Sequence, residues 1–281
     1  MATHISPVVL RQEVGRRIRL ARRHAGLTVV EASARLEITR SALSRFENGF
    51  GGVNVHLLRS MMDVYDQRMD DLLDMIRQAR APDWWRQYGV SDKAFVALET
   101  AATRASTYEL SFVPGLLQTA DYARALFLSG RERRSEDWLA NMLAVRMIRQ
   151  ERLTDEEHPL ELDAVLHESA LHLPVGGPPV MRNQLLHLTL INELPTVTLR
   201  ILPTSLISNE ALVGPFTVLD FPLAGQPGIS YALHALGDER QDKSEHVEPA
   251  RLRFRHLRSL ALTPEASIEL IERVANELWS S

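Results

Sequence analysis

The sequence predicts a protein of two domains, an all-α domain of five helices over residues 10–81 and an α+β domain over residues 82–281. The length of 281 residues suits about two domains. Apolar side chains recur at helical spacing through the first domain, whereas segments that alternate apolar and polar residues become frequent only after Leu160. These observations together give a multidomain chain whose two parts belong to different fold classes.

Composition excludes several classes of protein. With 45% hydrophobic and 24% charged residues, the chain is typical of globular proteins and not of disordered ones. It has no cysteine, which excludes disulfides and thiolate metal sites and suits a reducing compartment. No signal peptide is evident, and the longest apolar stretch, residues 211–225, is too short and interrupted to span a bilayer. We therefore expect a cytoplasmic protein that does not enter the membrane.

Charge is divided unevenly along the chain. Residues 1–50 hold nine Arg, no Lys and four Glu, a net charge of +5. Residues 82–281 hold 19 basic and 27 acidic side chains, a net charge of −8. A basic first domain on an acidic body predicts that the first domain binds a polyanion.

The first domain begins with an amphipathic helix. Its apolar stripe is formed by residues at steps of three or four: Leu10, Val14, Ile18, Ala21 and Ala25. Gly26 then ends the helix, because glycine adopts the left-handed conformation at little cost.

Two short helices follow, and each has its own start signal. Thr28 is a good N-cap for a helix over residues 29–36, and an acid three residues later completes the capping-box pattern. Thr39 caps the next helix, residues 40–48. Two helices of about eight residues joined by a turn near Glu37 form a helix-turn-helix.

The second short helix is expected to read the major groove of double-stranded DNA, as this motif does. Its outward face is formed by Arg40, Ser41, Ser44 and Arg45. Arginine can bond guanine O6 and N7 together, so Arg40 and Arg45 are the candidate base readers, with the two serines as short-range partners. Backbone amides at the helix starts, at Thr28 and Thr39, can bind phosphate oxygens.

The remaining residues of this domain are expected to be structural. Leu43 and Phe46 should point into the core, and Glu47 should pair with an arginine of the first helix. Two further helices, over residues 55–65 and 69–80, should close the domain.

The run from Gly26 to Gly49, GLTVVEASARLEITRSALSRFENG, resembles the helix-turn-helix of the XRE regulators, which include Cro and the phage repressors. The resemblance implies that Asn48 contacts a phosphate just after the reading helix. It also places Val29 where the family usually has a Gln that contacts the DNA backbone. A second departure is Glu37, which stands where the family often has Gly.

The second domain is expected to begin with helices, over residues 93–153, with an extended piece near Tyr108. Strands are expected over residues 160–167, 197–202, 216–221 and 229–236, with a helix over residues 180–193. Two helices end the chain, over residues 247–260 and 264–279. Strands that cluster beside flanking helices indicate an α+β domain.

Four stretches of this domain, at residues 104–119, 173–185, 194–203 and 214–222, resemble the C-terminal domain of a large actinobacterial regulator group. That group is similar to the sporulation-associated WhiJ regulators and joins an XRE helix-turn-helix to a domain of unknown function. The resemblance implies gene regulation. It also implies that a small partner protein is often encoded nearby, as in a toxin–antitoxin pair, and it assigns no catalytic residues.

No catalytic or metal site emerges from the residues. His167, Glu168 and His172 lie close in sequence, but no third ligand stands at a convincing spacing. The pair Gly176-Gly177 lacks the following Lys-Ser/Thr of a phosphate-binding loop, and no serine lies in a nucleophile elbow. We therefore expect no enzymatic activity, no metal and no cofactor.

Three functions stay open. The favoured one is a sequence-specific transcriptional regulator that acts as a homodimer and whose second domain senses a ligand or a small protein partner. The second is an antitoxin-like binding module with autoregulatory DNA binding, and the third is an enzyme with an attached DNA-binding domain. A ligand-sized apolar pocket in the second domain would favour sensing, and a flat apolar patch would favour a protein partner.

Overall fold

A computed structural model of the chain describes residues 7–49, 52–79, 84–89, 94–130, 134–206, 214–222, 228–234 and 237–280. The chain divides into two compact units, residues 1–86 and 87–281. The domain boundary that the sequence predicts, after residue 81, lies outside the described residues. Within the described ranges, no helix combines the length and the apolar content needed to cross a bilayer.

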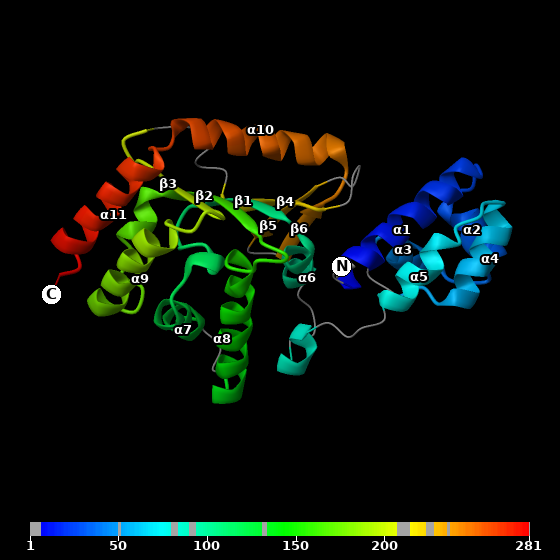
Figure 1. Cartoon of the computed structure of the whole chain (residues 1–281), viewed down its shortest axis with the longest axis horizontal. Coiled ribbons are helices and arrows are strands. Elements are labelled where there is room, and N and C mark those ends of the chain that lie inside the picture. The colour runs from blue at the N-terminus through cyan, green and yellow to red at the C-terminus, as the bar shows by residue number, and fades with distance from the viewer. Residues whose placement is uncertain are drawn as a thin grey trace. The chain divides into compact units, whose positions relative to one another are not determined.

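The described part of the first unit is formed by five helices (Figure 1), as the sequence predicts. They are α1 (Pro7–His24), α2 (Val29–Arg35), α3 (Arg40–Glu47), α4 (Val55–Tyr65) and α5 (Asp71–Gln78). The predicted stripe of α1 is buried except at its end. Ala25 is exposed, so its expected place on the stripe is wrong: the helix ends at His24, and Gly26, at φ 70°, turns the chain away.

One hydrophobic core joins these helices. Each contributes at least one side chain with almost no exposed surface, including Ile18, Ala32, Leu43, Leu58 and Leu72. Burial of an apolar side chain as large as leucine stabilises by roughly 1.5–3 kcal/mol. Leu43 is therefore core as predicted, whereas Phe46 is half-buried and packs against the edge of the core.

The second unit is built on a mixed sheet, which has six strands in the described residues (Figure 1). In spatial order these are β3 (Val197–Leu202), β2 (Glu161–His167), β1 (Arg104–Glu109), β4 (Phe216–Asp220), β5 (Ile229–His234) and β6 (Gly237–Gln241). The first three run parallel to one another, and the last three are antiparallel to their neighbours. The α+β class that the sequence predicts is confirmed.

Helices cover both faces of this sheet (Figure 1). One face carries α10 (Ser244–Leu260), and the other carries α6 (Ala94–Ala101), α7 (Ala120–Leu128), α8 (Glu136–Gln150) and α9 (Pro178–Ile191). The last helix, α11 (Pro264–Glu277), packs on α9 and β3. Because both faces are covered, the successive residues Ala164, Val165 and Leu166 are all fully buried.

The strands β1 and β6 differ from the sequence-based expectation. Helices are expected over residues 93–153 with an extended piece near Tyr108, but α6 ends at Ala101 and the extended piece is the whole strand β1. β6 lies where no strand is expected. Pairing with β2 on one side and β4 on the other makes β1 the centre of the sheet. Tertiary pairing of this kind outweighs a weak local pattern.

Candidate functional site

Helix α2 begins with the capping box that its sequence predicts. The Oγ1 of Thr28 accepts a hydrogen bond from the Glu31 N–H at 3.2 Å, and the Glu31 carboxylate accepts one from the Thr28 N–H at 2.9 Å. The Thr28 backbone N–H, followed by its hydroxyl, holds the pKa of the Glu31 carboxyl below its usual value. The exposed start of α2 is therefore fixed by local hydrogen bonds.

Helix α3 has equally defined ends. Thr39 Oγ1 accepts from the Ala42 N–H at 3.1 Å and lies 3.0 Å from the hydroxyl of Ser41. At the other end Gly49 has a φ of 72°, and a Cβ there would lie 2.8 Å from the Cα of Gln12 in α1. Only glycine allows α3 to end so close to α1.

The outward face of α3 carries the four side chains that the sequence predicts. Arg40, Ser41, Ser44 and Arg45 are all exposed. Neither arginine side chain forms a hydrogen bond or ion pair with another residue of the described part of the chain. Both guanidinium groups are therefore available to an external acceptor.

At the start of α2 the two predicted contact residues differ. Thr28 is exposed, but Val29 is half-buried and its side chain packs against the hydrophobic core. Val29 therefore presents mainly its backbone to the surface, in place of the amide side chain that the XRE family usually has there.

Asn48 is already held by other protein groups. Arg19 of α1 donates a hydrogen bond to Asn48 Oδ1. It also donates one to the backbone oxygen of Glu47, at 3.0 Å. The Asn48 amide nitrogen lies 3.4 Å from Ser44 Oγ. Arg19, which no sequence motif pointed to, thus positions the residue expected to contact a phosphate.

A buried ion pair joins α3 to α1. Arg22 donates from Nε and Nη2 to the two carboxylate oxygens of Glu47 at 2.6 and 2.9 Å, and from Nη1 to the Leu27 oxygen at 2.7 Å. The expected pairing of Glu47 with an arginine of the first helix is confirmed. Because Arg22 also holds the turn before α2, a single side chain orients all three helices. The hydrogen bonds that Arg22 donates to the Glu47 carboxylate raise the pKa of Arg22.

The second unit contains a partly open cavity of about 720 Å³ between the sheet and the helices α6, α7 and α8. Four aromatic side chains line it: Phe95, Phe112, Phe127 and Tyr231. Its charged lining residues include Glu109, Arg146, Arg149 and Asp238. Mostly apolar cavities of about 300–1,000 Å³ with a few polar groups are typical of small-molecule sites.

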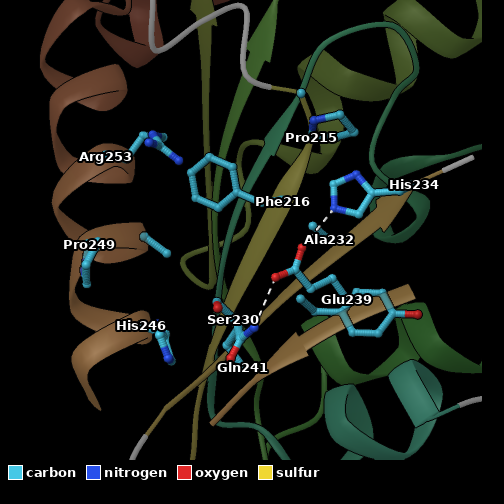
Figure 2. Close-up of a pocket in the computed structure, with 13 residues that line it drawn as sticks. Pro215, Phe216, Ser230, Ala232, His234, Glu239, Gln241, His246, Pro249 and Arg253 are labelled. Atoms are coloured by element: carbon cyan, nitrogen blue, oxygen red, sulfur yellow. Dashed lines mark hydrogen bonds and ion pairs between the residues drawn. The ribbon is translucent and has the colours of Figure 1, made fainter. Parts of the chain in front are cut away.

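A second, smaller cavity of about 290 Å³ lies on the other face of the sheet, against α10 (Figure 2). Its polar groups partly bind one another. Glu239 lies 3.3 Å from Nε2 of His234 and accepts a hydrogen bond from Gln241 at 3.0 Å, as the dashed lines in Figure 2 mark. His246 and Arg253 of α10 also line this cavity.

The histidines considered for a metal are not assembled into a site. His167 Nδ1 lies 2.7 Å from Ser169 Oγ, and His172 lies 3.9 Å from Glu168. In the described ranges, no group of three or more His, Asp or Glu side chains could hold a metal ion.

Comparison with known proteins identifies both units. Residues 13–75 match the family model of a helix-turn-helix domain. Residues 92–273, more than half of the chain, match the domain of unknown function DUF5753. No curated protein matches the chain, and no solved structure matches it. The helix-turn-helix domain indicates a DNA-binding regulator.

Proposed function

The chain belongs to the DUF5753 family and carries a helix-turn-helix domain ahead of the family domain, and we propose that it is a sequence-specific transcriptional regulator of the XRE type. The helix-turn-helix domain spans residues 10–81 and the C-terminal domain residues 82–281. The observation that carries the proposal is the exposed face of α3, with two arginines free of protein partners in the described residues.

In this proposal α3 lies in the major groove and reads base edges. Arg40 and Arg45 are five residues apart, about 7.5 Å along the helix axis at about 1.5 Å per residue. The two guanidinium groups therefore reach different base pairs of one half-site. Ser41 and Ser44, which lie between them, contact the intervening bases or the sugar–phosphate edge.

Phosphate contacts flank the reading helix. The N–H groups of Val29 and Val30 have no acceptor in the described part of the chain, so the start of α2 can bind a phosphate oxygen. Thr39 provides the equivalent helix start at α3. Asn48, held by Arg19, directs its amide nitrogen to the DNA backbone at the far end of α3.

The C-terminal domain acts as the sensor and dimerisation domain of a cytoplasmic regulator of the WhiJ-like group. The cavity of about 720 Å³ supports sensing of a small molecule over capture of a small partner protein encoded nearby. The most exposed leucines of the described helices, Leu128, Leu190 and Leu252, stand on three different helices and give less support to the antitoxin-like alternative.

The test is a gel-shift measurement with the purified full chain at low ionic strength. The DNA fragments include the region upstream of its own gene. We expect a sequence-dependent shift that the double variant Arg40→Ala/Arg45→Ala abolishes. The exposed Arg59 of α4 provides a matched control, and Arg59→Ala should retain binding. Failure to shift any fragment, the upstream region included, would overturn the proposal.

A further inference from the structure

One wall of the cavity beneath β1, β4 and β5 carries the carboxyl group of Glu109, because side chains alternate between the two faces of a strand. Tyr108 points to the α10 face, where it packs in a cluster with Phe254 and Leu257. Its neighbours Thr107 and Glu109 therefore point to the opposite face, and Thr107 bonds Thr217 there at 2.9 Å. Glu109, the last residue of β1, thus lies on the wall of the cavity.

The opposite wall supplies a cation without a carboxylate bonded to it. Arg146 of α8 donates from Nη1 to the neutral amide oxygen of Gln118 at 2.5 Å and lies 5.0 Å from the ring centroid of Phe127. Its other N–H groups have no acceptor in the described residues. Gly115 leaves the room for this guanidinium, since a Cβ there would lie 2.9 Å from Nη1.

Arg149, which follows Arg146 on the same helix, has a carboxylate partner that Arg146 lacks in the described part of the chain. Arg149, one turn further along α8, binds both carboxylate oxygens of Glu99 at 2.6 and 2.8 Å. Its charge is thereby offset inside the protein. Arg146 is half-buried and has no such partner among the described residues, although removing a charge from water is costly unless the charge is paired.

The two unpaired groups respond differently to burial. Burial lowers the pKa of Arg146 only to about 10, so this guanidinium stays charged at neutral pH. Burial raises the pKa of the Glu109 carboxyl to about 7, with Arg146 opposing the rise, so the carboxyl is about half protonated there. At neutral pH the guanidinium of Arg146 is therefore fully charged, whereas the carboxyl of Glu109 offsets that charge only in part.

We propose that this cavity binds a small molecule with an apolar body and an anionic oxygen head, such as a carboxylate. The head accepts hydrogen bonds from the free N–H groups of Arg146, and the body packs among the aromatic side chains of the lining. Glu109 in its protonated form donates a hydrogen bond to the head. The binding site stands independently of DNA, and only its role as an effector site rests on the proposed function.

This arrangement makes binding depend on pH. The other charged or titratable groups of the lining are Arg149, offset by Glu99 of α6, together with Asp238 of β6 and Tyr231 of β5. Asp238 lies exposed at the rim. As the pH rises through 7, Glu109 ionises and repels the anionic head, so affinity should fall.

Three probes of one apolar body but different head charge test the proposal: phenylbutyrate, phenylbutylamine and phenylbutanol. Isothermal titration of each into the full chain gives its affinity. We expect phenylbutyrate to bind at least tenfold more tightly than either of the others, and several-fold more tightly at pH 6 than at pH 8. Equal or tighter binding of the amine, or binding of none of the three, would overturn the proposal.

Variants assign the effect to residues. Arg146→Met should weaken phenylbutyrate binding at least tenfold, whereas Glu109→Gln should retain it and remove the pH dependence. Arg273→Met, on the exposed side of α11, is the matched control and should change neither. Thermal unfolding checks each variant, since Arg146 also holds Gln118. If Arg146→Met does not fold, the three probes on the native chain and on Glu109→Gln still decide the outcome.

The outcomes separate the two proposals. Binding of phenylbutyrate by a chain that shifts no DNA would support the ligand site and refute the proposed function as a regulator. A DNA shift without binding of any probe would support the regulator and refute the ligand site.

Discussion

At the scale of single residues, α3 offers a direct test of base reading. Arg40→Ala should cost roughly 1–3 kcal/mol of DNA-binding free energy and relax the preference at one base pair, because a bidentate contact to guanine is lost. Competition binding with single-base variants of the operator measures both effects. An equal loss on every sequence would mean that Arg40 contacts phosphate instead.

The buried pair of Arg22 and Glu47 allows a stability test. Glu47→Leu should lower the free energy of unfolding by about 3–5 kcal/mol, because the arginine stays buried without its carboxylate. The double variant Arg22→Met/Glu47→Leu should recover part of the loss, because no unpaired charge stays buried while the Leu27 oxygen still lacks its donor. Urea unfolding of the full chain measures both.

An exposed pair provides the matched control for this cycle. Arg77 and Asp74 lie 2.7 Å apart on the surface of α5, and Asp74→Asn should change the unfolding free energy by less than about 1 kcal/mol. A loss of similar size in the exposed and the buried variants would contradict the structural role of the buried pair.

The residues of α3 follow from the sequence more fully than the contacts that hold them. The outward face of four side chains follows from local spacing alone, since burial of Leu43 fixes the rotation of the helix. The pairing of Glu47 with an arginine of the first helix could also be expected, but not that Arg22 is the partner or that Arg19 holds Asn48, because these contacts join residues at least 25 positions apart in sequence. Asn48 itself could be predicted only from the family resemblance.

At the scale of elements, the turn between α2 and α3 is strained. Glu37 has a φ of 55°, a left-handed conformation that costs a residue with a Cβ about 1–2 kcal/mol. Glu37→Gly should raise the free energy of unfolding by about 0.5–1 kcal/mol, after the greater chain entropy of glycine is subtracted. Ala34→Gly, within α2, is the control and should lower it by about 1 kcal/mol. If Glu37→Gly lowered the free energy of unfolding as Ala34→Gly does, the backbone at Glu37 would not be strained.

The start of α2 should respond to acid. The pKa of Glu31 is lowered in the folded chain, so its ionised carboxylate stabilises the helix at neutral pH. This contribution is complete above the usual value of 4.5 and is lost as the pH falls through the lower folded-state value. Unfolding of the native chain and of Glu31→Gln should therefore differ at pH 7 and converge under acid conditions. A constant difference would exclude the electrostatic part of the cap.

Two strands lack a strong local signal: β1, of which only an extended piece near Tyr108 is expected, and β6, which is not expected at all. The strands β2 to β5 are easier to predict, because each is bounded by Pro or Gly or alternates apolar and polar residues. Their expected bounds differ from the observed ones by at most a few residues. β1 has the sequence RASTYE, and its identity comes from two partners distant in the chain. β6 has the sequence GDERQ, whose charges suit a sheet edge and hide the strand from any apolar pattern.

At the scale of the whole molecule, the cavity of about 720 Å³ is the feature that the sequence predicts least. Its lining runs from Phe95 to Asp238 and comes from helices, strands and loops that only the fold brings together. The charge division, in contrast, follows from the sequence alone. A first domain that is basic and a body that is acidic confine polyanion binding to one end of the chain.

The size of the reading helix also constrains how the whole molecule binds. Helix α3 has eight residues and reaches only a few base pairs, too few to specify one site in a chromosome. Two copies related by a twofold axis would bind an inverted repeat, with half-sites about 10 base pairs apart or a multiple of that. Footprinting should therefore show two protected half-sites. Insertion of five base pairs between them places the halves on opposite sides of the duplex and should reduce affinity to that of one half-site. A footprint over a single unrepeated half-site, or indifference to the insertion, would exclude the dimer.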